Sequence, residues 1–505
     1  MEYYLKWPPA HKRLIIGILL AGVLLRMAHL VMGDHYPILG ADSYYFHHLA
    51  DTIMSGADTP GGKSGLAYPL AWAGSVVGLD LAIIILPLIC YLADAAVLYC
   101  GAAIIFGTRK AMFTLVAFSV LPLSILITAA GYLDRDGFMV IPIASTIFLW
   151  YMCRRRPVAA LALIGGVETV VLCWAPSARW PILLMVAGIM GFVFLADRRE
   201  YPRPGWTGIF AGAAGVIMSA AVGILHHGST VRNLSETAVS SVSNPESIVE
   251  LTPATITHLV VFYSYIVIPL VIGIIILWKE RGKPASMLVL SWLILSVLPG
   301  LIFQRVMILT IPPVAITAGI GGVAMYNMVR QILSENPQAR LRAIALGMAG
   351  IMISGVIIQA VTLGSQGRLA ADRDWQNALA YLKYETLHDI RVLSNWDYGY
   401  WIIDLAERQP VCAGSPRLAD EMEAIFAAED PQLVYDIMKE YDADVLILDM
   451  GQVTGTAIDQ LPILYTSGDV RVLAEYPTEN TAGGTNQGGQ ECLGQSVDNP
   501  QGNDH

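Results

Sequence analysis

Long apolar runs separated by short polar segments dominate the first 364 residues of the chain. Runs of about 16 to 27 residues match the thickness of a lipid bilayer. Eleven runs are predicted as spans: roughly 14–32, 81–106, 111–130, 137–152, 157–174, 181–196, 207–225, 256–278, 285–302, 306–327 and 343–364. A further run, from Leu66 to Leu79, is short and contains Pro69, so we interpret it as interfacial or re-entrant. The pattern predicts a polytopic α-helical membrane protein.

The hydrophobic pattern changes after residue 364, where shorter amphipathic segments replace the membrane-length runs. Helical periodicity alternates with short apolar strands, and this alternation predicts a small α/β domain over residues 365–478. The expected helices are 374–384, 418–428 and 433–441, and the expected strands are 391–393 and 445–448. Residues 479–505 are rich in Gly, Asn and Gln, a composition typical of a disordered tail. We therefore expect a multi-span domain over residues 1–364, the α/β domain, and the tail.

Composition supports the membrane assignment, and charge divides the chain at the same place. The chain has 505 residues, of which 55% are hydrophobic and 14% charged, with a mean hydropathy of +0.55. Residues 1–364 carry 23 Lys and Arg against 17 Asp and Glu, a net charge of +6. Residues 365–505 carry 8 against 24, a net charge of −16. The acidic segment is therefore expected to be water-soluble and separate from the spans.

Basic residues in the loops predict the orientation of the chain. The N-terminus and the alternate loops that follow it hold 17 Lys and Arg, whereas the opposite loops hold five. The positive-inside rule then places the N-terminus in the cytoplasm. No cleavable signal peptide is predicted, because the first run is already of membrane length. An odd number of spans places the α/β domain outside the cell.

Six cysteines show no spacing typical of a metal site. Four lie in or beside apolar runs, where a free cysteine behaves as a small hydrophobe. Cys412 and Cys492 are the only two in the acidic segment. A disulfide between them is possible if this segment lies outside the cell.

The aromatic stretch from Ser394 to Trp401, with the sequence SNWDYGYW, is the part of the acidic segment richest in side chains suited to binding a ligand. Four aromatic rings beside the carboxylate of Asp397 are typical of a small pocket that grips a polar group. The same residues are equally compatible with a strand-to-turn corner in a domain core. Whether other candidate catalytic or binding residues lie on the same side of the membrane decides between the two interpretations.

Four carboxylates fall on the predicted outer side: Asp42 after the first span, Asp134 and Asp136 in a D-R-D sequence, and Glu250 before the eighth span. Carboxylate oxygens at alternate positions suit a hard divalent cation such as Mg²⁺ or Mn²⁺, with a phosphate completing its shell. The alternative is that each is a solvated loop acid. Arg305, at the outer end of the tenth span, is placed to bind a lipid phosphate or to snorkel to the interface.

With these motifs in this order, the chain resembles the catalytic subunits of oligosaccharyltransferases, in particular the archaeal and bacterial single-subunit enzymes. These are membrane glycosyltransferases of the GT-C type, which move a glycan from a lipid carrier to asparagine in Asn-X-Ser/Thr sequons. The resemblance implies a GT-C fold of about 11 to 13 spans with an external α/β domain. It covers most of the chain, and its separate motifs are short.

The resemblance also implies roles for particular residues. Asp42 and Glu250 would be catalytic, holding the acceptor amide, and would bind Mn²⁺ or Mg²⁺ together with Asp134 and Asp136. Arg305 would bind the lipid phosphate. The acceptor sequon would be bound by the residues of the aromatic motif and of an M-x-x-I spacing: Asn395, Trp396, Asp397, Tyr398, Met422 and Ile425.

Two features depart from the family pattern. Asn395 stands where the family motif Trp-Trp-Asp-Tyr-Gly has its first tryptophan, which removes an indole donor worth about 1 kcal/mol. The eleven spans are also two fewer than the thirteen usual in the family. The spacing of Met422 and Ile425 is common on any amphipathic helix, so its match is weak.

The resemblance implies protein N-glycosylation, with a lipid-linked oligosaccharide and an acceptor polypeptide as partners, in contact with membrane lipids. Three alternatives remain: a catalytically weakened paralogue that binds sequons, a GT-C glycosyltransferase with another acceptor, and a transporter. We expect a multi-pass plasma-membrane protein of a prokaryote, an archaeon, with no nucleic-acid partner.

Overall fold

The computed structural model describes residues 9–32, 37–57, 65–153, 185–186, 188–193, 195–196, 262–302, 304–332, 350, 371–413, 418–474 and 492–493. The chain forms two compact units. The helical unit comprises Met1–Met32 and Ile85–Ser365, and the α/β unit comprises Gly33–Ile84 and Gln366–His505. The first long loop thus packs with the C-terminal segment although some 300 residues of sequence separate them.

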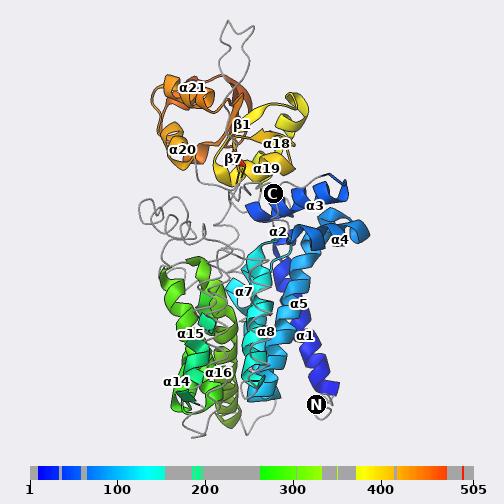
Figure 1. Ribbon diagram of the computed structural model, residues 1–505, viewed down its shortest axis with the longest axis vertical. Coiled ribbons are helices and arrows are strands. Elements are labelled where there is room, and N and C mark those ends of the chain that lie inside the picture. Colours follow the sequence, from blue (N-terminus) through cyan, green and yellow to red (C-terminus); the bar gives the residue numbers. More distant parts are fainter. Residues whose placement is uncertain are drawn as a thin grey trace, which may run out of the picture. The chain divides into compact units, whose positions relative to one another are not determined.

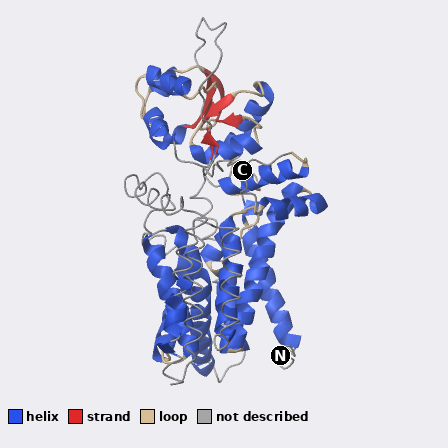
Figure 2. Cartoon of the chain, viewed as in Figure 1, coloured by secondary structure: helices blue, strands red, loops and turns tan. Residues whose placement is uncertain are grey.

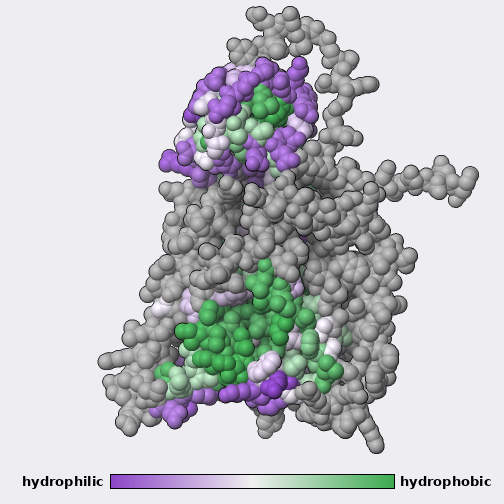
Figure 3. Space-filling model, turned by 90° about the vertical axis from the view of Figure 1, so that its left-hand side faces the viewer, coloured by the Kyte–Doolittle hydropathy of each residue, from purple (hydrophilic) through white to green (hydrophobic). Residues whose placement is uncertain are grey.

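The helical unit is a bundle of mostly apolar helices that lie side by side in Figure 1. Figure 3 shows hydrophobic side chains gathered over its surface. Its elements are α1 (Pro9–Met27), α2 (His29–Met32), α5 (Leu79–Phe106), α6 (Thr108–Val120), α7 (Pro122–Ile127), α8 (Arg135–Cys153), η4 (Ser264–Ile266), α14 (Val267–Lys279), α15 (Pro284–Ile302), η5 (Gln304–Thr310) and α16 (Ile311–Ile332). The first residues of α5 belong to the α/β unit.

Three described helices are long and apolar enough to cross a membrane: Leu79–Phe106, Pro284–Leu301 and Met307–Gln331. The count of eleven spans stays a prediction. The runs at 157–174, 207–225 and nearly all of 343–364 lie outside the described residues, and 181–196 and 256–278 are described only in part.

One expected span, 111–130, is interrupted in the structure. Helix α6 ends at Val120 and α7 begins at Pro122, with Leu121 between them in an extended conformation (φ −62°, ψ 119°). Proline has no backbone N–H and disfavours the helical conformation of the residue before it. Pro122 therefore explains the break, and the sequence pattern did not predict it.

Close packing around α16 depends on glycine. A Cβ atom on Gly273 of α14 would collide with the carbonyl oxygen of Thr317, and one on Gly321 would collide with that of Pro269. The backbones of α14 and α16 thus approach more closely than any side chain permits. Small residues are the usual means by which helices pack tightly where no water drives them together.

The α/β unit contains a five-stranded mixed sheet, drawn in red in Figure 2, in the order β2-β1-β4-β6-β5. Strand β1 (Arg391–Leu393) is parallel to β2 (Gln409–Pro410) and β4 (Val445–Asp449), whereas β6 (Val470–Ala474) is antiparallel to β4 and β5 (Ile463–Ser467). Beside them lie α3 (Ala41–Met54), α4 (Ala67–Val77), α18 (Arg373–Glu385), α19 (Gly399–Asp404), α20 (Ala419–Phe426) and α21 (Pro431–Glu440).

Helix α4 corresponds to the run that the sequence indicated as interfacial or re-entrant. The elements expected at 374–384, 391–393, 418–428, 433–441 and 445–448 are present with small shifts of their ends. Strands β5 and β6 were not predicted. A second, two-stranded parallel pairing joins β3 (Cys412–Ala413) to β7 (Cys492–Leu493), and it opposes Cys412 to Cys492 in register. The rest of the segment expected to be disordered, 479–505, lies outside the described residues.

Local signals start the helices of the C-terminal segment. The Asp372 carboxylate accepts a hydrogen bond from the backbone N–H of Trp375 at the start of α18. Asp430 does the same for Gln432 in α21, where Pro431 occupies the first helical position. Both arrangements satisfy N–H groups that a helix leaves without partners. They fix the two helices that flank the sheet.

Candidate functional site

The aromatic stretch leaves the carboxyl end of β1 and turns at once. Residues Trp396–Tyr398 form the 3₁₀ helix η6, and Gly399 begins α19. The Asn395 side chain accepts a hydrogen bond from the backbone N–H of Asp397 at 3.5 Å, which caps this turn. Carboxyl ends of parallel strands are common places for ligand sites in α/β domains. The stretch therefore lies at an edge of the sheet suited to binding.

Part of the stretch belongs to the core of the α/β unit. Tyr398 and Trp401 are 2% and 1% exposed, and their ring centroids are 5.1 Å apart. Trp375 of α18 packs against both, at 4.2 Å from Tyr398 and 5.5 Å from Trp401. The Tyr398 hydroxyl accepts a hydrogen bond of 3.1 Å from Gln452 Nε2. These rings provide a rigid foundation for the residues before them.

The other part of the stretch is accessible. Asn395, Trp396 and Asp397 are each half-buried. Trp396 packs against the hydrophobic cluster that contains Met422 and Ile425 of α20, both almost fully buried. The structure thus brings the expected M-x-x-I residues and the aromatic motif to one cluster, with Trp396 at its surface. The two interpretations of this stretch, core corner and pocket, apply to different halves of it.

Gly399 is required by close packing. A Cβ atom at this position would collide with the carbonyl oxygen of Cys412 and would lie 2.6 Å from the Cα of Ala413. Any other residue would push β3 away from the turn. The glycine of the Trp-Asp-Tyr-Gly sequence therefore has a structural reason that the sequence did not reveal.

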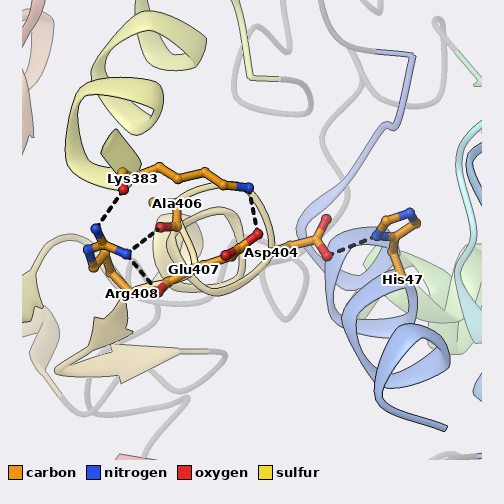
Figure 4. Close-up of polar contacts among 6 residues, drawn as sticks. All are labelled: His47, Lys383, Asp404, Ala406, Glu407 and Arg408. Carbon is orange, nitrogen blue, oxygen red and sulfur yellow. Dashed lines mark hydrogen bonds and ion pairs between the residues drawn. The ribbon is translucent and has the colours of Figure 1, made fainter. Parts of the chain in front are cut away.

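Helix α3, from the first long loop, packs on α19. Tyr44 lies 6.0 Å from Trp401 and Tyr45 lies 4.8 Å from Tyr400, measured between ring centroids. His47 completes the contact through its Nδ1 atom, which is 2.9 Å from Oδ1 of Asp404 (Figure 4). Aromatic pairs at such distances contribute about 0.5–1.5 kcal/mol each beyond their burial.

This contact brings Asp42 to the α/β unit. Asp42 is half-buried in the first turn of α3, which follows Gly40 in a left-handed conformation (φ 81°). Ser43 donates a hydrogen bond to the carbonyl of Leu39, and the Tyr44 hydroxyl donates one of 3.1 Å to that of Ile38. The start of the helix, and with it the backbone of Asp42, is held by these bonds.

A polar network, also drawn in Figure 4, fixes the chain after α19. Arg408 is 6% exposed and donates to the carbonyl oxygens of Lys383 at 2.7 Å and Thr386 at 2.8 Å. Lys383 bonds Glu407 at 2.5 Å, and this hydrogen bond lowers the pKa of the Glu407 carboxyl. The loop between α19 and β2 is thereby tied to the end of α18. Sequence reasoning did not identify this network, because its members are ordinary charged residues of a soluble domain.

Asp134 lies in the helical unit, directly before α8. It is 8% exposed, and its Oδ2 receives a long contact of 3.5 Å from the Tyr132 hydroxyl. Its Oδ1 is buried and has no hydrogen-bond partner in the part of the chain that the structure describes. A buried carboxylate oxygen in this state is costly unless a ligand satisfies it. Asp134 therefore fits the expected role of a ligand to a hard cation.

The structure does not unite all the expected metal ligands. Within the described residues, no group of three or more His, Cys, Asp or Glu side chains is arranged to hold an ion. Glu250 lies outside the described residues, and for Asp136, in the first turn of α8, the side chain is not described. The same holds for Arg305 in η5. Asp42 and Asp134 belong to different units, so their joint role stays a prediction.

Arg26 is a residue of the helical unit whose importance the sequence did not indicate. It is fully buried and donates hydrogen bonds to Thr128 Oγ1 at 2.6 Å, Ser124 Oγ at 2.8 Å and the Ser119 carbonyl at 3.0 Å. Its guanidinium also lies 3.7 Å from the centre of the Tyr91 ring. Arg26 thus joins α1 to the interrupted helices α6 and α7, just ahead of the segment that carries Asp134.

Comparison with known proteins gives matches in sequence and in fold. No protein family model matches the chain. Dolichyl-phosphooligosaccharide-protein glycotransferase 2 of Pyrococcus furiosus is 28% identical over 169 residues, which is 33% of this chain and 21% of that protein. The curated relatives are matched over only 14% to 30% of their own length.

Solved structures of other proteins share the fold. The archaeal oligosaccharyltransferase AglB from Archaeoglobus fulgidus, in complex with an inhibitory peptide and a dolichol-phosphate, aligns with a TM-score of 0.62 and 15% identity, covering 88% of this chain and 69% of that one. ArnT from Cupriavidus metallidurans, bound to undecaprenyl phosphate, aligns with a TM-score of 0.53 and 13% identity over 94% and 99% of the two chains. The fold is therefore that of GT-C membrane glycosyltransferases, and the expected resemblance to oligosaccharyltransferase catalytic subunits is confirmed.

Proposed function

Because the chain resembles the catalytic subunits of oligosaccharyltransferases in sequence and in fold, we propose that it is a protein N-glycosylation enzyme. It transfers an oligosaccharide en bloc from a dolichyl-type phosphate or diphosphate lipid to asparagine in Asn-X-Ser/Thr sequons. The observation that carries the proposal is the packing of α3, with Asp42 in its first turn, against α19, which begins at the glycine of the Trp-Asp-Tyr-Gly sequence. Two motifs of one expected site thus meet in one unit.

Recognition of the acceptor follows from the half-buried part of the aromatic stretch. Trp396 and Asp397, with Asn395 beside them, bind the sequon hydroxyl, and the buried Tyr398 holds them in place through the core. Met422 and Ile425 form the apolar support beneath Trp396. The Archaeoglobus enzyme has also been solved with a tethered acceptor peptide containing an NVT sequon, which supports a peptide acceptor for this chain.

The reaction must activate a weak nucleophile. The asparagine amide nitrogen forms a bond to the sugar C1 while the bond from C1 to the phosphate oxygen of the lipid breaks and its electron pair leaves with the phosphate. The amide loses one proton to one of the carboxylates that hold it. Asp42 and Glu250 hold the amide by accepting hydrogen bonds from its N–H groups, which keeps the nitrogen directed at C1. Arg305 binds the lipid phosphate. Asp42, Asp134, Asp136 and Glu250 would hold Mn²⁺ or Mg²⁺. When bound, this ion would neutralise the charge of the phosphate that leaves.

The topology belongs to the same proposal. The N-terminus lies in the cytoplasm and the α/β unit outside, in the plasma membrane of a prokaryote, and the distribution of basic loop residues supports this orientation. The count of 11 to 13 spans is proposed on the same basis. Asp42, the Asp134 segment and the aromatic stretch then all face the outer side, where lipid-linked glycans meet translocated polypeptides.

A second candidate is a GT-C glycosyltransferase that acts on another acceptor. The alignment with ArnT over almost the full length of both chains favours it. The Trp-Asp-Tyr-Gly sequence and its support by Met422 and Ile425 favour a peptide acceptor instead. Asn395 stands where the family motif has its first tryptophan, and this difference favours a third candidate. The third candidate is a weakened paralogue that binds sequons without turnover.

One assay separates these candidates. Purified protein in lipid nanodiscs is given lipid-linked oligosaccharide, Mn²⁺, and either a fluorescent sequon peptide or the same peptide with glutamine in place of asparagine. We expect a glycopeptide only from the asparagine peptide. No product, while the Archaeoglobus enzyme works in parallel, would exclude the proposal. Peptide binding without product would indicate the paralogue, and glycan transfer to a lipid acceptor alone would indicate the second candidate.

A further inference from the structure

Three side-chain pairs join α3 to α19, and the two aromatic pairs lie nearer the start of each helix than the histidine–aspartate pair. Tyr45 and Tyr44 contact Tyr400 and Trp401, and His47, further along α3, contacts Asp404 at the end of α19. The beginning of α3 therefore lies toward the beginning of α19. Asp42 occupies the first turn of α3, and the Trp396–Tyr398 turn directly precedes α19. The His47–Asp404 pair, drawn in Figure 4, lies at the end of α19.

The polar pair in this contact is tightly enclosed. The Asp404 side chain is 5% exposed and that of His47 is 17% exposed. One Asp404 oxygen bonds His47, and the other is buried with no hydrogen-bond partner among the described residues. A buried carboxylate that has one partner depends strongly on it, because its remaining hydration is lost. The hydrogen bond from His47 thus offsets the cost of burying the Asp404 carboxylate at this position.

The groups facing His47 favour its protonated form. Asp404 faces it from α19, and Oδ1 of Asp80, in the first turn of α5, lies 3.4 Å from its Nε2. Helix α4 contributes no Asp, Glu, Lys, Arg or His, and α3 itself adds Asp42, His48 and Asp51. Burial alone lowers the pKa of His47, but the hydrogen bond and charge of Asp404, with the charge of Asp80, outweigh it and raise the pKa above its usual value.

We propose that His47 and Asp404 form a positioning pair that holds the first turn of α3, and so Asp42, beside the acceptor-binding turn at Trp396–Tyr398. This inference rests on the proposed function. The pair itself touches neither substrate nor ion. It acts through α3, by fixing where one carboxylate stands relative to the residues that bind the sequon.

The position of the pair explains how it affects the reaction. The acceptor is bound by residues on the η6 turn, while its amide is held by a carboxylate on α3, which enters the unit from a distant part of the sequence. A displacement of about 1 Å between such groups can cost up to about 100-fold in rate. Loosening α3 from α19 should therefore lower kcat and leave the KM for the peptide nearly unchanged.

The sign of the pH dependence follows from the raised pKa. The contribution of charged His47 is fully present below its unfolded-state pKa and is lost as the pH rises through the higher folded-state value. Neutral His47 still donates its Nδ1–H to Asp404, so part of the effect remains at high pH. Wild-type kcat should contain a component that declines on the alkaline side and that depends on this pair.

The test compares full-length variants in the peptide glycosylation assay between pH 5.5 and 9. His47→Ala and Asp404→Asn should each lower kcat about tenfold at pH 6, with peptide KM changed less than about twofold. The double variant should be no worse than either single one, since both remove the same interaction. His47→Asn, whose amide nitrogen stands near the place of Nδ1, should restore part of the rate without the alkaline decline.

Two matched controls and one stability measurement keep the test sharp. His48→Ala removes the neighbouring histidine, and Asp80→Asn removes the exposed carboxylate near His47. Both should keep kcat at pH 6 within about twofold, and Asp80→Asn should move the alkaline decline to lower pH, because one of the charges that raise the pKa of His47 is lost. Thermal unfolding identifies variants that fail to fold, and His47→Asn then serves in place of His47→Ala.

The outcomes are distinct. Additive losses in the double variant, or an unchanged kcat and pH profile in folded His47 and Asp404 variants of an active enzyme, would overturn this inference alone. A wild-type protein that transfers no glycan would overturn the proposed function, and the positioning role with it.

Discussion

Replacing Asn395 with tryptophan tests whether the departure from the family motif weakens acceptor binding. Asn395 is half-buried and ends the turn between β1 and η6. Its side chain makes one hydrogen bond there, from the backbone N–H of Asp397 at 3.5 Å. Because the side chain is not enclosed by the core, a larger residue can extend outward without displacing packed neighbours.

The expected effect of Asn395→Trp on stability and on peptide binding follows from one hydrogen bond lost and one gained. A hydrogen bond of 3.5 Å lies at the outer limit of useful geometry, so its loss should cost no more than about 0.5 kcal/mol of stability. An indole N–H directed at the sequon hydroxyl should add about 1 kcal/mol to binding. This free energy corresponds to about a fivefold lower KM for the peptide, with kcat unchanged or slightly raised.

The assay is a peptide titration at saturating lipid-linked oligosaccharide, with Asn395→Ala as the matched control. The alanine variant loses the cap and adds no donor, so its Tm should fall slightly while its KM stays near that of the wild type. Repeating the titration with serine and threonine sequons shows whether both hydroxyls benefit. A tryptophan variant with an unchanged or higher KM, and an intact Tm, would refute the placement of residue 395 beside the acceptor.

Three further predictions concern other parts of the chain. Asp134→Ala and Glu250→Ala should each abolish glycan transfer, and removal of divalent ions with EDTA should do so reversibly, with activity restored by Mn²⁺ in the glycopeptide assay. Arg26→Leu should cost about 3 kcal/mol or more, because it leaves several buried acceptors without their donor, and the Tm should fall well below that of a variant in which an exposed arginine of α1 is replaced. Cys412 and Cys492 are opposed in register, and we expect a disulfide between them. The protein is alkylated under denaturing conditions without reductant, digested and analysed by mass spectrometry, and the two cysteines should appear in one linked peptide. Two fully alkylated cysteines would contradict this.

The elements of the C-terminal segment were accessible from the sequence because their signals are local. Helix α21, for example, begins with Asp430 and Pro431, which cap and start it, and its buried positions Val434, Ile437 and Met438 follow the helical period. Strand β5 was missed because it lies at the edge of the sheet and its residues are largely exposed. An edge strand with one face in water carries a weak hydrophobic signal.

The contacts that build the candidate site could not be predicted in this way. His47 and Asp404 are 357 positions apart, and nothing near either residue indicates the other. The same is true of Arg26 and Thr128, whose hydrogen bond crosses 102 positions. Helical periodicity shows which side of a helix is buried but not which partner buries it. The break at Pro122 is different, because a local signal was present there and the apolar run concealed it.

The division of the aromatic stretch into a buried and an accessible half explains how one short sequence can serve both packing and recognition. Tyr398 and Trp401 are enclosed with Trp375, so close packing holds their rings in place. Trp396, two residues before Tyr398, is half-buried and packs against the hydrophobic cluster that contains Met422 and Ile425. A binding residue held in this way loses little conformational entropy when it binds, and preorganisation of this kind is a main source of affinity in small polar sites. The motif thus serves both packing and recognition. At Gly399 only the absence of a side chain lets β3 approach closely enough to pack against the turn.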